Sequence, residues 1–356
     1  MSNLELPRPP AFSTLRPGQP QHEGAEPHMK ARILKALGVD GEVHRLTGRE
    51  KQDGCFIVVT PGSPKLLLKL IPDDLVDRQR VADKLSVLAG KSADASKRVF
   101  ETRVDQYAAF AYPYVEGRRA GAVVSDMFAI GQAIAEVHQA FRASAPADQV
   151  RDAARNWLTY LDGVAERVLR DEVAGYPAKA SKCLAQRTVP LNAYVDASAS
   201  QVLHGDLNFG NVLIGNTQNA DVALILDFEN AARSFGPVGL DLLFALERFC
   251  FPLKTDETVT QELAVALLSG YTSVSALTDM WLGEIGADAV LTVIMIHSWR
   301  ALAVLAAQVI RGDNLQAAEV EKFLMLLRDA PRKAAIITRA MDAIEGGHGI
   351  LQVRAS

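Results

Sequence analysis

One short segment of the chain constrains its fold more than any other. Asn211–Ile214 and Val222–Asp227 are two aliphatic runs separated by a polar turn, a pattern that predicts a β-hairpin within an otherwise helical part of the chain. Asp206 lies five residues before Asn211, and Asp227 ends the second run. The sequence therefore predicts one carboxylate on a tight loop, with an amide side chain and a second carboxylate opposite each other.

These three side chains fit phosphoryl transfer. That reaction needs an acceptor hydroxyl held in line with the phosphate, a group that takes its proton, and cations that neutralise the phosphate oxygens. Asp206 can take the proton. The oxygens of Asn211 and Asp227 suit Mg²⁺, which keeps waters and substrate phosphates as its other ligands. Aspartates also occur as plain turn and cap residues, but the order of loop, hairpin and second acid favours the catalytic interpretation.

The rest of the chain divides into a β-rich first part and a helical second part. Phe56–Thr60 and Leu66–Ile71 predict a hairpin, and an amphipathic helix follows with Asp73 or Asp74 as its cap. The further expected elements are strands at 99–104 and 108–114, helices at 127–141, 151–170 and 178–194, and helical sequence from residue 240 to the end.

This order of elements predicts an α+β fold of two lobes. Residues 29–116 are expected to form a small lobe, an antiparallel sheet with one main helix, and residues 117–356 a larger, mostly helical lobe. Residues 1–28 are rich in proline and poor in large apolar side chains, which predicts a flexible tail.

Three groups of residues give the chain a family resemblance. They are His204-Gly205-Asp206-Leu207-Asn208-Phe209-Gly210-Asn211, then Ile225-Leu226-Asp227-Phe228-Glu229, and then Asp241, supported by the helical segment Gly131–His138. With these motifs the chain resembles the aminoglycoside phosphotransferase and choline kinase-like family over roughly residues 40 to 310. Phe209 stands where proline is common in that family, which alters the stiffness of the loop.

The resemblance implies a two-lobed, protein-kinase-like fold and an ATP- and Mg²⁺-dependent phosphotransferase that acts on a hydroxyl of a small molecule. Asp206 would be the catalytic acid/base, and Asn211 and Asp227 would bind Mg²⁺. His204 and Asp241 would brace the catalytic loop. These roles are expectations that follow from the resemblance.

Lys69 is the expected phosphate contact of the small lobe. It lies on an apolar strand, where its ammonium needs an anion, and the α- and β-phosphates of ATP would supply one. The helix that follows has no glutamate to pair with it, so Asp77, Gln79 and Asp83 are the candidate partners.

Two other segments are expected to contact the nucleotide. Gly48 and Arg49 belong to a glycine-containing turn whose N–H groups and charge suit phosphates, although an ordinary hairpin turn fits the pattern equally well. Tyr112, Tyr114 and Val115 belong to the segment that joins the lobes. Its backbone is the expected docking edge for adenine, with the tyrosines as flat walls.

The acceptor is constrained far less by the sequence. Residues 119–356 carry 20 Lys and Arg against 27 Asp and Glu. This balance favours a cationic acceptor such as an aminoglycoside, an amino sugar or an amino alcohol. Conceivable contacts, each also explained as a surface or core residue, are Asp162, Glu229, Glu247, Asp256 and Trp299.

Two functions other than small-molecule phosphorylation are considered. A nucleotide-binding pseudokinase or regulatory protein would explain the missing glutamate partner of Lys69, whereas the complete set of Asp206, Asn211 and Asp227 argues against it. A kinase of protein hydroxyls would need an activation segment, and the short passage from Asp227 to Asp241 leaves little room for one.

Composition bears on partners and compartment. The net charge of −4 offers no basic field for nucleic acid. Three scattered cysteines make no disulfide framework, and the N-terminus has no apolar signal region, so a cytoplasmic protein is expected. The apolar run 289–310 contains Arg300, which predicts a buried helix and no membrane partner. Nothing in the sequence fixes the oligomeric state.

Overall fold

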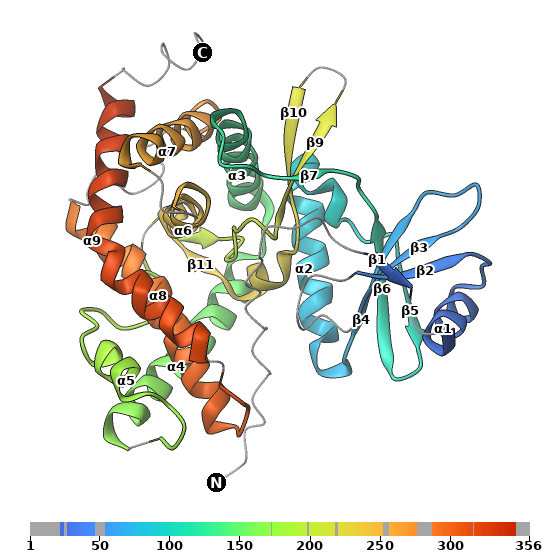
Figure 1. Cartoon of the computed structure of the whole chain (residues 1–356), viewed down its shortest axis with the longest axis horizontal. Coiled ribbons are helices and arrows are strands. Elements are labelled where there is room, and N and C mark those ends of the chain that lie inside the picture. The colour runs from blue at the N-terminus through green and yellow to red at the C-terminus, as the bar shows by residue number, and fades with distance from the viewer. Residues whose placement is uncertain are drawn as a thin grey trace.

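A sheet and a bundle of helices form the two lobes of the chain (Figure 1). The computed structural model describes residues 22–24, 27–46, 54–171, 173–197, 199–217, 220–251, 256–275, 287–315 and 317–346. The sheet is formed by the first third of the chain and the bundle by the remainder, so the predicted two-lobed α+β fold is confirmed.

The small lobe is a six-stranded antiparallel sheet with the strand order β1-β2-β3-β4-β6-β5. Its strands are β1 (His22–Gly24), β2 (Glu42–Leu46), β3 (Cys55–Val59), β4 (Leu66–Ile71), β5 (Phe100–Val104) and β6 (Tyr107–Pro113). The hairpin predicted from the aliphatic runs is confirmed as β3 and β4. Both strands predicted beyond the helix are confirmed as β5 and β6.

The two faces of this sheet have different roles because side chains alternate along a strand. Phe56 and Leu68 point to one face and pack with Ile33 of helix α1 (Pro27–Leu37). Phe110 and Tyr112 point to the other face, against the start of helix α2 (Val76–Leu88). Lys69 follows Leu68 and pairs with Phe110, so it shares the second face, and its ammonium reaches Asp227 of the helical lobe.

Helix α2 connects the two lobes. Its Ala82 and Leu85 belong to the main core of the helical lobe, and the 3₁₀ segment η2 (Gly90–Ser96) that follows adds Ala93. The predicted cap is wrong, because a 3₁₀ turn, η1 (Asp73–Leu75), precedes the helix and the cap residue has no side-chain bond. Asp73 instead accepts a hydrogen bond from Arg103 at 3.0 Å.

The helical lobe surrounds a β-hairpin. Its elements are β7 (Arg118–Arg119), α3 (Val124–Ser144), α4 (Ala147–Arg170), α5 (Ala178–Ala185), β8 (Gln201–Val202), β9 (Val212–Thr217), β10 (Ala220–Ile225), η3 (Phe228–Arg233), β11 (Phe235–Gly236), α6 (Val238–Cys250), α7 (Glu257–Thr272), α8 (Ala287–Ile310) and α9 (Ala317–Glu345). Strands β9 and β10 confirm the second predicted hairpin, and β7, from the segment that joins the lobes, pairs with β9.

Helices α3 and α7 approach each other closely because a glycine stands on each of them. A Cβ atom added at Gly131 would lie 2.7 Å from the Tyr271 nitrogen, and one at Gly270 would lie 2.8 Å from the Phe128 carbonyl carbon. Both distances are shorter than any ordinary contact. Gly131, which contributes to the family resemblance, therefore has a packing role.

Helix α8 is long and apolar enough to cross a membrane by length and composition, over Ala289–Ile310. In the folded protein, 67% of its most apolar stretch is buried. Trp299 and Leu302 lie in the main core of the helical lobe. The helix packs as the sequence predicts for a core element.

The structure departs from the sequence predictions in two other places. Residues 22–24 pair with β2 and a helix begins at Pro27, so the end of the predicted tail is structured; residues 1–21 lie outside the described part of the chain. The helix predicted over residues 178–194 ends at Ala185. Pro190 cannot continue a helix, and Tyr194 adopts a left-handed backbone with φ of 75°.

Candidate active site

The loop from His204 to Asn211, between β8 and β9, is held from below by Asp241 at the start of α6. One oxygen of the Asp241 carboxylate accepts the N–H of His204 at 2.6 Å, and the other accepts the N–H of Gly205 at 2.8 Å. His138 lies 3.3 Å from the same carboxylate. Burial opposes ionisation of Asp241, but His138 and the Gly205 N–H outweigh it and hold the pKa of this carboxyl below its ordinary value.

His204 joins the same loop to the strand that leads to Asp227. Its Nε2 lies 2.9 Å from the carbonyl oxygen of Leu226, and its Nδ1 lies 3.2 Å from the backbone nitrogen of Asp206. A carbonyl only accepts, so Nε2 donates and Nδ1 accepts the Asp206 N–H. The side chain is fully buried, and its ring packs edge-on against Phe228. With both nitrogens engaged, His204 is placed to hold the loop.

Asp206 lies at the tip of this loop, surrounded by amide side chains. Asn208 donates to one carboxylate oxygen at 2.7 Å, and Asn211 donates to the other at 3.1 Å. Asn230, from the segment after Asp227, lies 3.5 Å away. Burial is the main cause that raises the pKa of Asp206 above its ordinary value, and the nearby Asp227 adds to it. The hydrogen bonds hold the carboxylate in one orientation.

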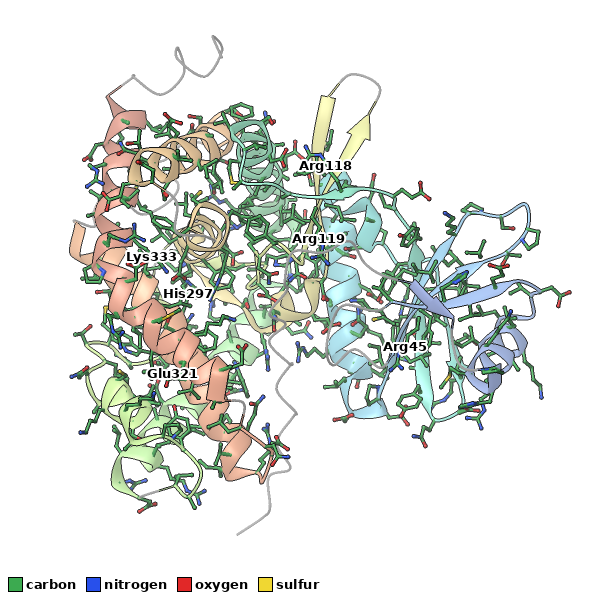
Figure 2. The ribbon with its side chains drawn as sticks, viewed as in Figure 1. Arg45, Arg118, Arg119, His297, Glu321 and Lys333 are labelled. Carbon is green, nitrogen blue, oxygen red and sulfur yellow. The ribbon has the colours of Figure 1, made fainter. Side chains whose placement is uncertain are left out.

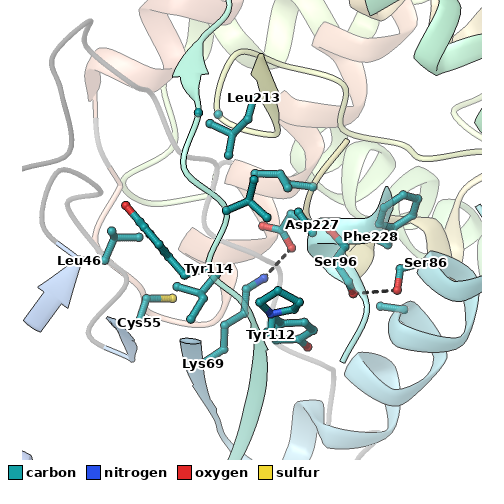
Figure 3. A pocket seen from close by; sticks show the side chains of 18 of the residues that line it. Leu46, Cys55, Lys69, Ser86, Ser96, Tyr112, Tyr114, Leu213, Asp227 and Phe228 are labelled. Carbon is teal, nitrogen blue, oxygen red and sulfur yellow. Dashed lines mark hydrogen bonds and ion pairs between the residues drawn. The ribbon is translucent and has the colours of Figure 1, made fainter. Parts of the chain in front are cut away.

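Asp227 and Lys69 form an ion pair between the lobes. The Lys69 ammonium lies 3.1 Å from Asp227 (Figure 3). It also lies 3.4 Å from Glu229. Burial opposes the charge of Lys69, but the two carboxylates outweigh it and hold its pKa well above the ordinary value. Asp227 has a left-handed backbone, with φ of 63° and ψ of 71°, a conformation that aspartate tolerates better than most residues.

The partner of Lys69 is therefore not on helix α2, where the sequence placed the candidates. Asp77 is 97% exposed and pairs with Arg80. Gln79 and Asp83 are both buried and both bind the Tyr112 hydroxyl, at 2.7 and 2.8 Å. Glu229, considered in the sequence as an acceptor contact, supplies the additional carboxylate instead.

Asn211 and Asp227 fit a bound Mg²⁺ by the chemistry of their donors. The amide nitrogen of Asn211 donates to the carbonyl and the carboxylate of Asp206, at 2.8 and 3.1 Å. This leaves the Asn211 amide oxygen, which makes no hydrogen bond within the described residues, for a cation. One neutral and one anionic oxygen donor match a metal ion that also keeps phosphate and water ligands.

A cavity of about 190 Å³ lies between the lobes above this loop (Figure 3). Lys69, Tyr112, Tyr114 and Val115 all line it, together with Asp227. Gly48 and Arg49, expected at the phosphates, lie outside the described residues.

The peptide groups of the joining segment differ in their hydrogen bonds. The Tyr114 N–H donates to the carbonyl of Lys65 at 3.0 Å and is therefore committed to the sheet. Val115 makes no peptide hydrogen bond within the part of the chain that the structure describes. An uncommitted peptide group at Val115 is what the predicted docking edge for adenine requires.

A second and larger cavity, of about 390 Å³, lies on the helical lobe beside Asp206. Phe209 and Gly210 line both cavities, so the loop from His204 to Asn211 forms the boundary between them. Trp157, Phe244 and Phe323 give the second cavity aromatic walls. The residues that line this cavity come from distant parts of the chain, and no motif in the sequence connects them.

The five acceptor contacts considered in the sequence do not line this cavity. Asp162 binds the N–H groups at the turn after residue 190, and Glu247 pairs with the buried Lys333 at 2.8 Å. Asp256 caps helix α7, and Trp299 is a core residue with 1% exposure. These four have structural positions.

Sequence reasoning also missed residues that hold the site. Asn208 and Asn230 both contact the Asp206 carboxylate. Arg78 on α2 donates to the Glu229 carbonyl at 3.0 Å and joins the small lobe to the segment after Asp227. Both asparagines stand next to recognised motif residues, a proximity that could have identified them. Arg78 carries no such signal.

The site combines a half-buried carboxylate, Asp206, on a loop between two cavities with a cationic side chain from the opposite lobe that is paired to a second acid. This is the arrangement of phosphoryl-transfer enzymes. The profile of the phosphotransferase enzyme family matches residues 44–277, which is more than half of the chain. The chain belongs to this family.

Solved structures share the fold at low sequence identity. A thermostable mutant of aminoglycoside phosphotransferase APH(4)-Ia is 12% identical, with a TM-score of 0.52 over 87% of this chain and 98% of that one. Its variant in complex with AMP-PNP and hygromycin B is 13% identical, with a TM-score of 0.52 over 88% and 99%. An aminoglycoside phosphotransferase from Alicyclobacillus acidocaldarius is 15% identical, with a TM-score of 0.49 over 88% and 96%. A search of curated protein sequences finds no match.

Proposed function

We propose that the protein transfers the γ-phosphate of ATP to a hydroxyl group of a small molecule and requires Mg²⁺. The observation that carries this proposal is the position of Asp206 on a loop that separates two cavities. A group that takes a proton from the acceptor hydroxyl must lie where acceptor and nucleotide meet. Among the described carboxylates, only Asp206 lies on the loop between the cavities and is also held in one orientation by hydrogen bonds.

Each residue then has a task in the transfer. Asp206 orients the acceptor hydroxyl and accepts its proton, and the hydrogen bond from Asn208 keeps the Asp206 carboxylate oriented. Lys69 binds the nucleotide phosphates, since its ammonium lines the cavity and lies between two half-buried carboxylates. Asn211 and Asp227 hold Mg²⁺, which when bound supplies neutralisation of the phosphate charge.

Tyr112, Tyr114 and Val115 are proposed to bind the adenine ring, and His204 and Asp241 to keep the catalytic loop in place. Support for the latter comes from four hydrogen bonds that these two side chains make to the loop and to Leu226. We place the protein in the cytoplasm because the free cysteines, two of them buried, suit a reducing compartment. The small-molecule acceptor is the proposed partner.

One observation favours a second function, a nucleotide-binding pseudokinase. No carboxylate of helix α2 pairs with Lys69 in the described structure, and the lysine pairs with Asp227 and Glu229 instead. Such a protein would bind nucleotide without transferring phosphate.

The deciding experiment measures ADP release from Mg-ATP across acceptors that include aminoglycosides, choline, ethanolamine, homoserine and simple sugars. Asp206→Asn and Asp227→Ala are compared with Asp77→Asn, a control on a 97% exposed side chain. We expect acceptor-dependent release that both site variants abolish and the control retains. Calorimetric binding of AMP-PNP with no ADP release under any condition would establish the pseudokinase instead.

A further inference from the structure

The cavity beside Asp206 is lined by four basic side chains from four separate elements. They are Arg233 at the end of η3, Arg248 on α6, Arg300 on α8 and Lys322 on α9. The acidic residues that line it, within the described chain, are Asp206 and Asp241, and Asp241 is already engaged by the loop N–H groups. The cavity is therefore positively charged, although the region that contains it carries more acids than bases.

Two of these bases have no carboxylate partner among the described residues. The Arg233 guanidinium stacks on Trp157 at 4.3 Å and is 3.4 Å from the Asn230 amide oxygen. The Arg248 guanidinium stacks on Phe244 at 4.8 Å. Stacking fixes the plane of each guanidinium. Glu229 lies near enough to Arg233, and Asp206 near enough to Arg248, to interact with their charges without a direct ion pair. Their N–H groups can therefore bind an anion that enters the cavity.

The other two bases are partly committed. Arg300 donates through Nε to the Leu191 carbonyl at 2.9 Å, which anchors the loop before β8. Lys322 lies 3.3 Å from Glu319, one turn away on the same helix. Burial lowers the pKa of Lys322 although Glu319 raises it, and the nearby positive charge of Arg248 lowers it further. Asp206 also faces Lys322 and offsets part of this repulsion, and an anion bound between Lys322 and Arg248 would reduce it further.

His297 lines the same cavity but adds no charge to it. Figure 2 shows this side chain inside the helical lobe. Burial, with Arg300 nearby, lowers its pKa to about 3, and its Nε2 lies 3.1 Å from the Leu240 carbonyl. The positive character of the cavity at neutral pH comes from the arginines and Lys322.

We propose that the acceptor is an anionic hydroxyl compound, whose carboxylate or phosphate group is bound by Arg233, Arg248 and Lys322 while its hydroxyl reaches Asp206. Arginine binds both kinds of anion through paired N–H groups. The aromatic walls provide room for an apolar part of the molecule. This inference rests on the proposed phosphotransferase function, and it reverses the cationic acceptor expected from the regional charge.

The test combines direct binding with transfer. Calorimetry with Mg-AMP-PNP at saturation measures binding of glycerol 3-phosphate and glycerate, with glycerol as the neutral control and ethanolamine as the cationic one. Binding of inorganic phosphate is measured in the same way, to show whether the site binds the anionic group alone. ADP release from Mg-ATP is measured with the same compounds. The variants are Arg248→Gln, Arg233→Gln and the charge-preserving Arg248→Lys. The matched control is Arg332→Gln, an arginine near the Phe251 ring outside the cavity.

We expect the anionic compounds to bind the native protein and to bind Arg248→Gln and Arg233→Gln at least ~10-fold more weakly. Arg248→Lys should be affected less and Arg332→Gln not at all. Binding or phosphorylation of ethanolamine that Arg248→Gln leaves unchanged or improves would overturn the proposal while leaving the kinase function intact. Absence of anion binding to the native protein also overturns it. Failure of AMP-PNP to bind would count against the proposed function instead.

Discussion

Gly205 offers the sharpest test of the idea that the catalytic loop is held in one geometry. It adopts φ of +80°, and a Cβ atom at this position would lie 2.6 Å from the Ser234 Cβ and still closer to the Ser234 hydroxyl. Gly205→Ala therefore introduces a left-handed alanine, which costs about 1–2 kcal/mol, and a clash. The loop cannot simply move away, because the Gly205 N–H is bound to Asp241 at 2.8 Å.

The size of the effect follows from the required displacement. The two Cβ atoms need roughly 1 Å of additional separation to reach ordinary contact, and a misplacement of about 1 Å costs on the order of 10²-fold in rate, or about 2.7 kcal/mol in the activation free energy. We expect Gly205→Ala to have a kcat lower by on the order of 10²-fold and to retain AMP-PNP binding. The assay is ADP release with a productive acceptor, with calorimetry of AMP-PNP alongside.

A second substitution separates the clash from the backbone strain. Ser234→Gly removes both atoms that the new methyl group would meet, so Gly205→Ala/Ser234→Gly should recover part of the lost rate but not the backbone contribution. Ser234→Gly alone is the control. Full activity of Gly205→Ala, or a double variant no faster than Gly205→Ala, would refute the steric argument.

Three further predictions concern charged residues. Lys333→Met leaves the 1% exposed Glu247 unpaired and should lower the free energy of unfolding by about 3–5 kcal/mol. The double variant Lys333→Met/Glu247→Leu should lie within about 1 kcal/mol of the native protein in urea unfolding. Equal losses in the single and double variants would contradict this prediction. Lys69→Met should weaken AMP-PNP binding, measured by calorimetry, about 10- to 100-fold, whereas Lys65→Met, at an exposed lysine, should not weaken it. If the two variants bind AMP-PNP with similar affinity, Lys69 is not part of the nucleotide site. Because the folded-state pKa of Asp241 lies below its ordinary 3.8, ionised Asp241 stabilises the fold above that pH, and this stability is lost as pH falls through the folded-state pKa. The stability difference between native and Asp241→Asn, measured by urea unfolding, should thus narrow from about pH 5 toward about pH 3, and a gap independent of pH would exclude this linkage.

Much of the fold could be predicted from local patterns. The two hairpins, with Phe56 opposite Leu68 in one and Val212 opposite Ile225 in the other, follow from aliphatic runs around polar turns. The helix predicted through residue 194 went wrong because the apolar pattern continues past Ala185, while Pro190 ends the possibility of a helix. The structured residues 22–24 carry no local signal, since they form a strand only by pairing with β2.

The candidate site divides in the same way. Asp206, Asn211 and Asp227 lie within 22 positions of one another on a loop and its hairpin, so local backbone geometry brings them together and the sequence could place them. Lys69 was recognised, but its carboxylate partners were not. Glu229 reaches it only because the lobes meet, and a contact between residues 160 positions apart leaves no mark in either local pattern.

By itself, the sequence determined the two lobes, the catalytic loop and the hairpin that follows it, because those features depend on periodicity and on residues close together in the chain. Only the tertiary structure decided the sign of charge at the cavity beside Asp206, the proposed acceptor site. The regional composition sums all side chains, most of them solvated, whereas an acceptor meets the few that converge at Asp206. Arg233, Arg248 and Lys322 stand on three elements whose side chains meet through the packing of the helical lobe.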